Sequence, residues 1–232
     1  YPYILNTGRI RDQWHTMTRT GKSPRLNQHI NEPFVSINPE DARRENIAAN
    51  NLVRVTSSQG SITVRANITQ EQQVGQVFVP MHWNDQYSAD ARTGAVVNDF
   101  VDPYSGQPEF KHTPVKLERY QADWQAFIFS RYKLSFSSID YWTTSRLAGY
   151  WHYELAGKGD IAGTYDELMQ VLRSTGDDSP AQWLHYQDSG TRTYRSAHIS
   201  HDQLYGCMFI EPFGELSSRE WLQSLFEVES LT

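Results

Sequence analysis

Short runs of alternating apolar and polar residues in the first half of the chain constrain its fold more than any other feature. Leu52–Ser57 and Ser61–Ile68 alternate in this way on either side of Ser58-Gln59-Gly60, which is the pattern of a hairpin with one buried face. Four further β-type runs are Tyr3–Leu5, Pro33–Ile37, Gln76–Pro80 and Thr113–Glu118. An all-β barrel is the natural closure for such a set of strands. We therefore expect residues 1–120 to form a six-stranded β-barrel.

One short helix is expected among these strands, starting at Asn38-Pro39-Glu40-Asp41-Ala42. The Asn is a favourable N-cap, Pro suits the first helical position, and two acids face the positive end of the helix dipole. We expect this helix to end near Asn46–Ala49. The stretches from Gly8 to Glu32 and from Asn84 to Lys111 show no clean period. Loops of that length in a compact domain are usually functional or disordered.

The character of the sequence changes after Glu118, where five of the seven Trp residues follow. Thr164-Tyr-Asp-Glu167 and Ser217-Ser-Arg-Glu220 fit capping boxes ahead of apolar residues at helical spacing, and predict two helices. Strands are predicted at Phe127–Arg131, Tyr150–Leu155, Trp183–Gln187, Thr191–Ala197 and Leu204–Ile210, with a turn at Asp188-Ser189-Gly190. We expect residues 121–232 to be a separate, smaller α+β domain, to which the sequence assigns no role.

Composition excludes several classes of function. The chain has 21 Lys and Arg against 27 Asp and Glu, a net charge of -6, which argues against nucleic acid as a partner. Its apolar runs are far shorter than the roughly 20 residues that span a bilayer, so no membrane partner is expected. The single Cys207 excludes an iron–sulfur cluster held by cysteines of this chain, and no metal site is predicted. Because the sequence begins Tyr1-Pro2-Tyr3, without Met or a signal-peptide pattern, we expect it to be a piece of a larger protein.

The segment Thr7–Gly21 directly follows the first predicted strand and has the composition of an oxyanion grip. It contains three Arg, four Thr, two Gly and one His in fifteen residues. Gly lets backbone N–H groups approach a phosphate, Thr hydroxyls donate, and Arg supplies a bidentate charge, so phosphate or pyrophosphate is the expected ligand. A solvated polar loop has the same composition, and that alternative stays open.

Two later segments carry weaker signals. Asp102–His112 contains two turns set by Pro and Gly and ends in Lys111-His112 before the last barrel strand, which alone is typical of a rigid connector. His82-Trp83 follows Pro80-Met81 at a strand end and offers a polar donor beside an aromatic face. Such a pair is also common in simple packing.

Taken in order, these segments resemble a known family. Four motifs carry the resemblance: Thr-Gly-Arg-x4-Trp-His-Thr at 7–16, Pro-x3-Ile-Asn-Pro-x-Asp-Ala at 33–42, Met-His-Trp at 81–83, and Asp-Pro-x-Ser-Gly-Gln-Pro-Glu-x-Lys at 102–111. Together they are similar to the C-terminal cofactor-binding domain of the bacterial molybdopterin oxidoreductases. Within that superfamily the chain most resembles assimilatory nitrate reductase large subunits. The resemblance covers roughly residues 1–120.

The resemblance implies a fold and a set of contacts. The fold is a six-stranded double-psi β-barrel that binds parts of two molybdopterin guanine dinucleotides, whose dithiolenes hold molybdenum (Mo-bis-MGD). The cofactor contacts it implies are Thr7, Gly8, Arg9, Trp14, His15, Thr16, His82, Gln107 and Lys111. Met81 falls where related enzymes carry a residue near the substrate funnel. The family's Asn aligns nearer Gly94, four residues before Asn98, so Asn98 is not among the predicted contacts.

The function implied is that of the cofactor-binding C-terminal part of a cytoplasmic molybdenum nitrate reductase that converts nitrate to nitrite in assimilation. No catalytic residue is expected in this part, because the molybdenum ligand and the cysteines of a [4Fe–4S] cluster come from upstream domains in the family. Those upstream domains and an electron-donor protein or domain are the expected partners. Two alternatives stay open: the same domain of another molybdopterin oxidoreductase, such as a formate dehydrogenase, or a non-catalytic double-psi barrel that acts as a binding module.

Overall fold

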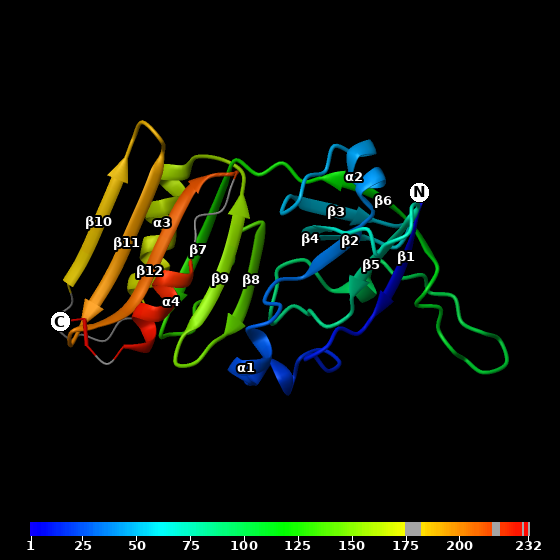
Figure 1. Ribbon diagram of the computed structural model, residues 1–232, viewed down its shortest axis with the longest axis horizontal. Helices are drawn as coiled ribbons and strands as arrows, with labels where there is room; N and C mark the ends of the chain where they lie inside the picture. The colour runs from blue at the N-terminus through cyan, green and yellow to red at the C-terminus, as the bar shows by residue number, and fades with distance from the viewer. Residues whose placement is uncertain (175–181, 215–218, 229, 232) are drawn as a thin grey trace. The chain divides into compact units, whose positions relative to one another are not determined.

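The structure is a computed structural model that describes all residues except 175–181, 215–218, 229 and 232. The chain divides into two compact units (Figure 1). The first comprises residues 1–22 and 29–121, and the second comprises residues 23–28 and 122–232. Each unit is described below by itself.

The first unit is a closed barrel of six strands, as the sequence predicts. The strands are β1 (Tyr3–Gly8), β2 (Phe34–Ile37), β3 (Leu52–Thr56), β4 (Ser61–Ile68), β5 (Gln76–Pro80) and β6 (Thr113–Arg119). Their order around the barrel is β1-β5-β2-β4-β3-β6. The pairs β1–β5 and β2–β4 are parallel and the other pairs are antiparallel. Parallel neighbours that are distant in sequence place the loops after β1 and β5 side by side at one end of the barrel.

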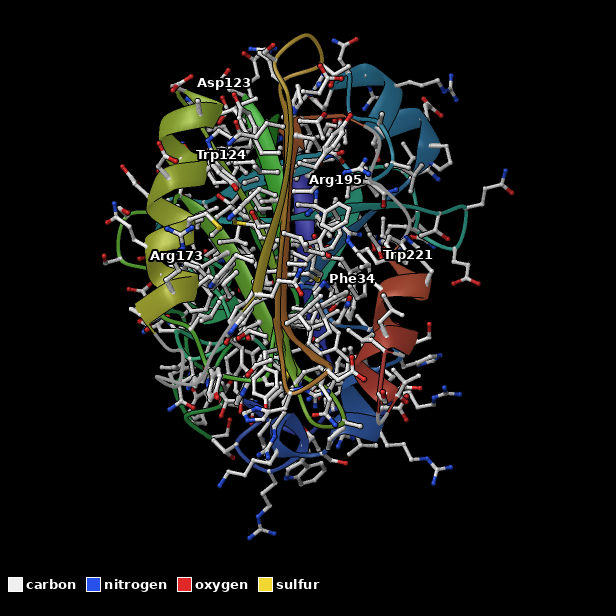
Figure 2. All side chains as sticks on the ribbon, turned by 90° about the vertical axis from the view of Figure 1, so that its left-hand side faces the viewer. Phe34, Asp123, Trp124, Arg173, Arg195 and Trp221 are labelled. Atoms are coloured by element: carbon white, nitrogen blue, oxygen red, sulfur yellow. The ribbon has the colours of Figure 1, made fainter. Side chains whose placement is uncertain are left out.

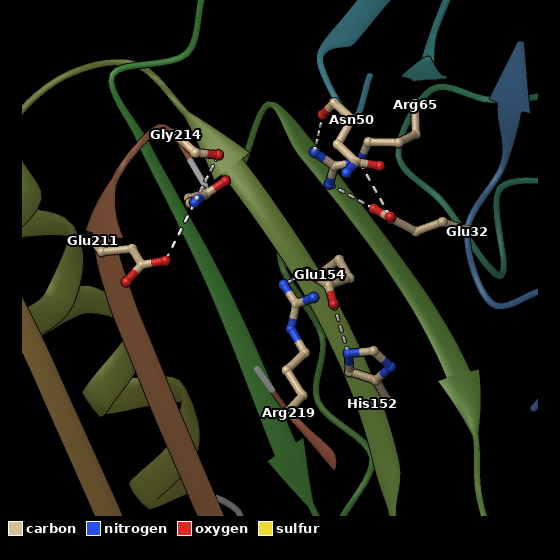
Figure 3. A network of polar contacts seen from close by, with 9 residues as sticks. Glu32, Asn50, Arg65, His152, Glu154, Glu211, Gly214 and Arg219 are labelled. Carbon is tan, nitrogen blue, oxygen red and sulfur yellow. Dashed lines mark hydrogen bonds and ion pairs between the residues drawn. The ribbon is translucent and has the colours of Figure 1, made fainter. Parts of the chain in front are cut away.

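The barrel core follows from the alternation of the strands. Val53 and Val55 of β3 and Ile62 and Val64 of β4 are fully buried, as are residues of β1, β2 and β5. Burial of such side chains contributes about 1.5–3 kcal/mol each. The buried Arg65 of β4 is paired with Glu32 at 2.7 Å, so its charge is compensated (Figure 3).

Short helices connect the barrel strands. In α2 (Pro39–Arg44) the side chain of Asn38 accepts from the backbone N–H of Glu40 at 2.8 Å, which confirms the predicted cap. The helix ends at Arg44, slightly before the expected region, and Asn46 then takes a φ of 55°. Three one-turn elements occupy the stretches that lack a period: η1 (Thr20–Lys22), α1 (Pro24–Asn27) and η2 (Thr93–Ala95).

The second unit is built on one antiparallel sheet with the order β10-β11-β12-β7-β9-β8. The strands are β7 (Trp124–Ser130), β8 (Tyr141–Arg146), β9 (Trp151–Gly157), β10 (Gln182–Asp188), β11 (Thr193–Ser200) and β12 (Gln203–Pro212). The helices α3 (Ile161–Ser174) and α4 (Glu220–Glu227) cover opposite faces of the sheet (Figure 2). All five predicted strands and both predicted helices are present. Strand β8 was not predicted, because Tyr-Trp-Thr-Thr-Ser-Arg is mostly polar although most of it is buried.

A buried carboxylate on β9 is paired with a neighbour on the same strand and with Arg219, the residue before α4. Glu154 accepts from Arg219 at 2.7 Å and lies 2.8 Å from the ring of His152 (Figure 3). Cys207 is fully buried, and burial raises the pKa of its thiol to about 12, in keeping with a small hydrophobic role.

The start of α3 differs from the prediction. The helix begins at Ile161, three residues before the expected cap at Thr164. Asp160 accepts from the N–H of Gly163 at 2.8 Å, while the Thr164 hydroxyl donates to the carbonyl of Asp160 at 2.8 Å. Asp160 is therefore the capping residue, because its carboxylate accepts from a free N–H group of the first turn. The other capping box includes Ser217, which lies outside the described residues, and α4 begins at Glu220.

None of the helices described in the structure has the length and apolar character needed to cross a membrane.

Candidate functional site

The end of β1 and the segment before β6 meet at one end of the barrel. Thr7 donates to the carbonyl of Phe110 through both its backbone N–H, at 3.3 Å, and its hydroxyl, at 2.8 Å. The ammonium group of Lys111 donates to the carbonyl of Thr7. These contacts join residues more than 100 positions apart and place the two predicted binding segments against each other.

Gly8 is needed at this junction for a steric reason. A Cβ at this position would lie 3.0 Å from Cε2 of Phe78 and 3.6 Å from Nζ of Lys111. The absence of a side chain therefore lets the Phe78 ring of β5 pack closely on the end of β1, while the Lys111 ammonium lies at an ordinary contact distance.

Arg9 and Lys111 supply two positive charges at this place. Both are exposed, and across the described part of the chain no carboxylate forms an ion pair with either. The Arg9 guanidinium lies 5.4 Å from the ring centroid of Trp14, which in turn meets the ring of His15 edge-on at 4.6 Å. Two cations without an ion-pair partner among the described residues, one of them beside an aromatic face, fit a nucleotide pyrophosphate.

The backbone of the first loop, Arg9–Gly21, is held in an uncommon conformation. Asp12, His15 and Met17 have φ values of 73°, 43° and 60°, in the left-handed region that non-glycine residues seldom occupy. Such conformations persist only where surrounding contacts determine them, and they cluster at functional sites. This loop is therefore shaped by its neighbours.

His82 does not take the role predicted for it. The residue is fully buried, its Nε2 accepts from the backbone N–H of Ile10 at 3.0 Å, and its Nδ1–H donates to the carbonyl of His15 at 2.6 Å. Burial lowers the pKa of the imidazole. Since both ring nitrogens are engaged by the backbone, no polar atom of His82 is left for a cofactor. The sequence predicts a polar side chain after β5, but the groups that this side chain contacts are set by the tertiary structure.

The other predicted residues differ in their access to a ligand. Trp14, His15, Thr16 and Gln107 are exposed, and Met81 is 37% exposed next to the site's edge at the end of β5. The hydroxyl of Thr7 already donates to Phe110, so only its oxygen lone pairs stay available. The side-chain amide of Asn98 donates to the carbonyl of His112 at 3.2 Å. This hydrogen bond connects the residues at the two ends of the second loop.

The second loop, Asp99–Lys111, is shaped by its own residues. A carboxylate oxygen of Asp102 accepts from the N–H groups of Ser105, at 2.7 Å, and Tyr104, at 3.1 Å. These hydrogen bonds, with the backbone N–H of Ser105 the strongest, lower the pKa of Asp102. Sequence reasoning missed two residues outside both loops, Asn84 and Tyr87, which bind the first loop's backbone.

The barrel and the paired loops define a dinucleotide-binding domain, and comparison with known families agrees. Residues 3–114 match the family model described as the molydopterin dinucleotide binding domain. These residues therefore form a domain of this family.

Curated relatives extend the comparison. A nitrate reductase of Klebsiella oxytoca is 45% identical over 157 residues, which is 68% of this chain and 18% of the relative. The F420-dependent formate dehydrogenase subunit alpha of Methanocaldococcus jannaschii is 41% identical over 119 residues, 51% of this chain and 17% of the relative. The assimilatory nitrate reductase catalytic subunit of Bacillus subtilis is 34% identical over 117 residues, 50% of this chain and 16% of the relative. The chain thus spans less than a fifth of the length of each of these relatives.

Among solved structures, the acetylene hydratase from Pelobacter acetylenicus is similar with a TM-score of 0.45 and 18% identity, over 52% of this chain and 18% of that one.

Proposed function

We propose that this chain is the cofactor-binding C-terminal part of a molybdenum nitrate reductase that binds Mo-bis-MGD and reduces nitrate to nitrite. The observation that carries the proposal is that Lys111 reaches the end of β1, directly before Arg9 in the chain, and that no carboxylate of the described residues forms an ion pair with either cation. Similarity to nitrate reductases over 68% of the chain favours nitrate among the possible substrates.

The residues of this chain would hold and orient the dinucleotide. Arg9 and Lys111 offer charge-assisted hydrogen bonds to phosphate oxygens. Trp14 presents an aromatic face beside Arg9, while His15 and Gln107 have exposed polar atoms that can read donors and acceptors. When bound, the cofactor supplies the molybdenum at which nitrate gives up an oxygen atom.

The remaining parts of the enzyme would cover the second loop. Phe100 is 66% exposed, Val101 57% and Tyr104 98%, which is a large apolar area for one short segment. We assign this loop to contact with the upstream domains of the same polypeptide, which would provide the molybdenum ligand and the [4Fe–4S] cysteines. An electron-donor protein or domain completes the set of partners. Similarity to an assimilatory relative supports a cytoplasmic location, which is part of the proposal.

Formate oxidation is the second candidate activity. It is favoured by 41% identity to a formate dehydrogenase subunit across the barrel. The barrel contacts described above would serve either reaction, because they bind the cofactor and not the substrate.

Viologen-coupled assays of the full-length enzyme distinguish between these two activities. Oxidation of reduced methyl viologen by nitrate, with nitrite formed in a ratio of one per two electrons, is the expected result. Reduction of oxidised viologen by formate would instead support the second candidate. A protein with a full cofactor content but neither activity would still support the cofactor-binding role. It would rule out both nitrate and formate as the substrate.

A further inference from the structure

We propose that the segment His82–Tyr87, which follows β5, positions the first loop for the dinucleotide without contacting the dinucleotide itself. We call it the bracing segment. The inference rests on the proposed cofactor-binding function and assigns to this chain three positioning residues: His82, Asn84 and Tyr87. Their side chains hold four backbone atoms of the loop.

His82 fastens the loop at two points. A backbone carbonyl can only accept, so the contact at 2.6 Å with the carbonyl of His15 requires a proton on Nδ1. The backbone N–H of Ile10 can only donate, so Nε2 must be unprotonated at the other contact. One neutral tautomer therefore satisfies both ends of the Ile10–His15 stretch, and the imidazolium ion could satisfy only one.

Asn84 and Tyr87 continue the same arrangement along the loop. Asn84 donates from its side-chain amide to the carbonyl of Thr16 at 3.0 Å, while its amide oxygen accepts from the N–H of Gln86. The hydroxyl of Tyr87 donates to the carbonyl of Met17 at 3.1 Å. Three successive loop carbonyls are thus bound by three side chains of one short segment.

Tyr87 also shapes the end of the loop by contact. A Cβ on Gly21 would lie 2.4 Å from the Tyr87 hydroxyl oxygen, so the loop backbone packs directly on this ring. Burial raises the pKa of the Tyr87 phenol, which keeps it a hydrogen-bond donor at neutral pH.

The loop needs such support because of its own conformation. Its left-handed residues Asp12, His15 and Met17 lie within or beside the stretch that the bracing segment holds. Without those contacts the backbone would relax toward commoner conformations, and the exposed Arg9 and Trp14 would lose their orientation. Ordering the loop before the ligand arrives lowers the entropy that binding has to overcome. The bracing residues therefore act on affinity through the loop.

The test uses the full-length protein and two readouts. The first is hydrogen–deuterium exchange of peptides covering residues 9–17, measured without cofactor. The second is molybdenum and guanine-nucleotide content after purification. His82→Phe and Tyr87→Phe should each raise exchange in the loop, by about tenfold for a single lost neutral hydrogen bond, and lower cofactor content. His82→Gln, which keeps a donor and an acceptor, should restore part of the protection.

Matched controls separate this inference from the proposed function. Tyr186→Phe and His201→Gln change the same residue types in the second unit and should leave both readouts unchanged. Arg9→Ala should lower cofactor content without raising exchange at Ile10. If Arg9→Ala and Lys111→Ala retain full cofactor, the proposed function fails whatever the exchange shows.

The inference itself is overturned if Tyr87→Phe and Asn84→Ala leave loop exchange and cofactor content at the level of the unchanged protein. These two variants also cover the case in which His82→Phe does not fold, because neither removes a fully buried side chain.

Discussion

The two loops at the candidate site are ordered by opposite means. The first, Arg9–Gly21, is held from outside by side chains about 70 positions away in the sequence. The second, Asp99–Lys111, is held mainly by itself, through Asp102 and through backbone bonds such as that from Gly106 to Asp102 at 2.9 Å. The first loop is therefore shaped before any partner binds. The second is a locally closed turn whose exposed apolar side chains still lack a covering surface.

This difference suggests how the two loops divide the work. A loop braced from the barrel can present charges at fixed positions, which suits recognition of a pyrophosphate. A self-closed loop with Phe100 and Tyr104 exposed suits contact with another part of a larger protein. The predictions that follow test this division, beginning with the largest effect.

The largest effect is expected on separating this chain from the rest of the enzyme. Both loops can contact the dinucleotide from one side only, so the 232-residue chain alone should bind neither molybdenum nor iron and should not reduce nitrate. Metal analysis and a viologen-coupled assay on the purified chain measure this. Stoichiometric molybdenum, or turnover above the reagent blank, would show that the two loops suffice and that our interpretation of the chain as part of a larger site is wrong.

A smaller loss is expected on removing one cation from each loop. Arg9→Ala and Lys111→Ala in the full enzyme should each weaken cofactor retention by about 1.5–3 kcal/mol, or roughly tenfold to hundredfold, since each removes a charge-assisted contact. The melting temperature of the cofactor-free protein should barely change, because neither cation forms an ion pair with described residues. Arg119→Ala, at the end of β6, is the control. A full molybdenum complement in the double variant would contradict the assignment.

Gly8→Ala should have a moderate effect on the junction between the loops. The added methyl group would meet the Phe78 ring of β5 at 3.0 Å, so that ring must shift by a few tenths of an ångström. We expect a loss of about 1 kcal/mol in the free energy of unfolding, at the lower end of the range for overpacking. Urea unfolding measures it, and exchange at Phe110 and Lys111 should rise with it. Gly94→Ala, where a Cβ would meet nothing within 4 Å, is the matched control.

The smallest expected effect is a difference in the pH dependence of the loops. Burial lowers the pKa of His82 in the folded state. The contribution of neutral His82 to the stability of the loop is therefore complete above the unfolded-state pKa of about 6.5, and it is lost as the pH falls through the folded-state pKa. Hydrogen bonds lower the pKa of Asp102 in the folded state. The contribution of its carboxylate to the stability of the second loop is therefore lost only as the pH falls below the unfolded-state pKa of about 3.9. The first loop should therefore lose protection at a higher pH than the second.

Exchange rates corrected for intrinsic pH dependence measure this difference. Arg9 and His15 face the His82 ring, and His29 pairs with Asp12 at 3.0 Å, so their charges also bear on the first loop. His29→Gln, which removes the contact with Asp12, is the control. Simultaneous loss of protection in both loops would argue against separate means of ordering.

Much of the barrel could be predicted because its signals are local. The alternation of Val53 and Val55 specifies which face of β3 is buried, and Asn38-Pro39 specifies the start of α2. Local signals failed at the start of α3, because Asp160 and Thr164 are both residue types that cap helices and the pattern did not distinguish between them. They also failed at β8, whose buried residues are largely Thr and Ser.

The sequence by itself determined the six strands of the barrel, the cap of α2 and the inventory of charges and glycines in Thr7–Gly21. The tertiary structure alone decided that Lys111 meets the end of β1 and that His82 serves the loop's backbone instead of a ligand. The physical reason is that a strand or a cap is specified by residues next to one another. A hydrogen bond between Ile10 and His82 joins positions 72 apart, and no local pattern records which partner a buried imidazole will find.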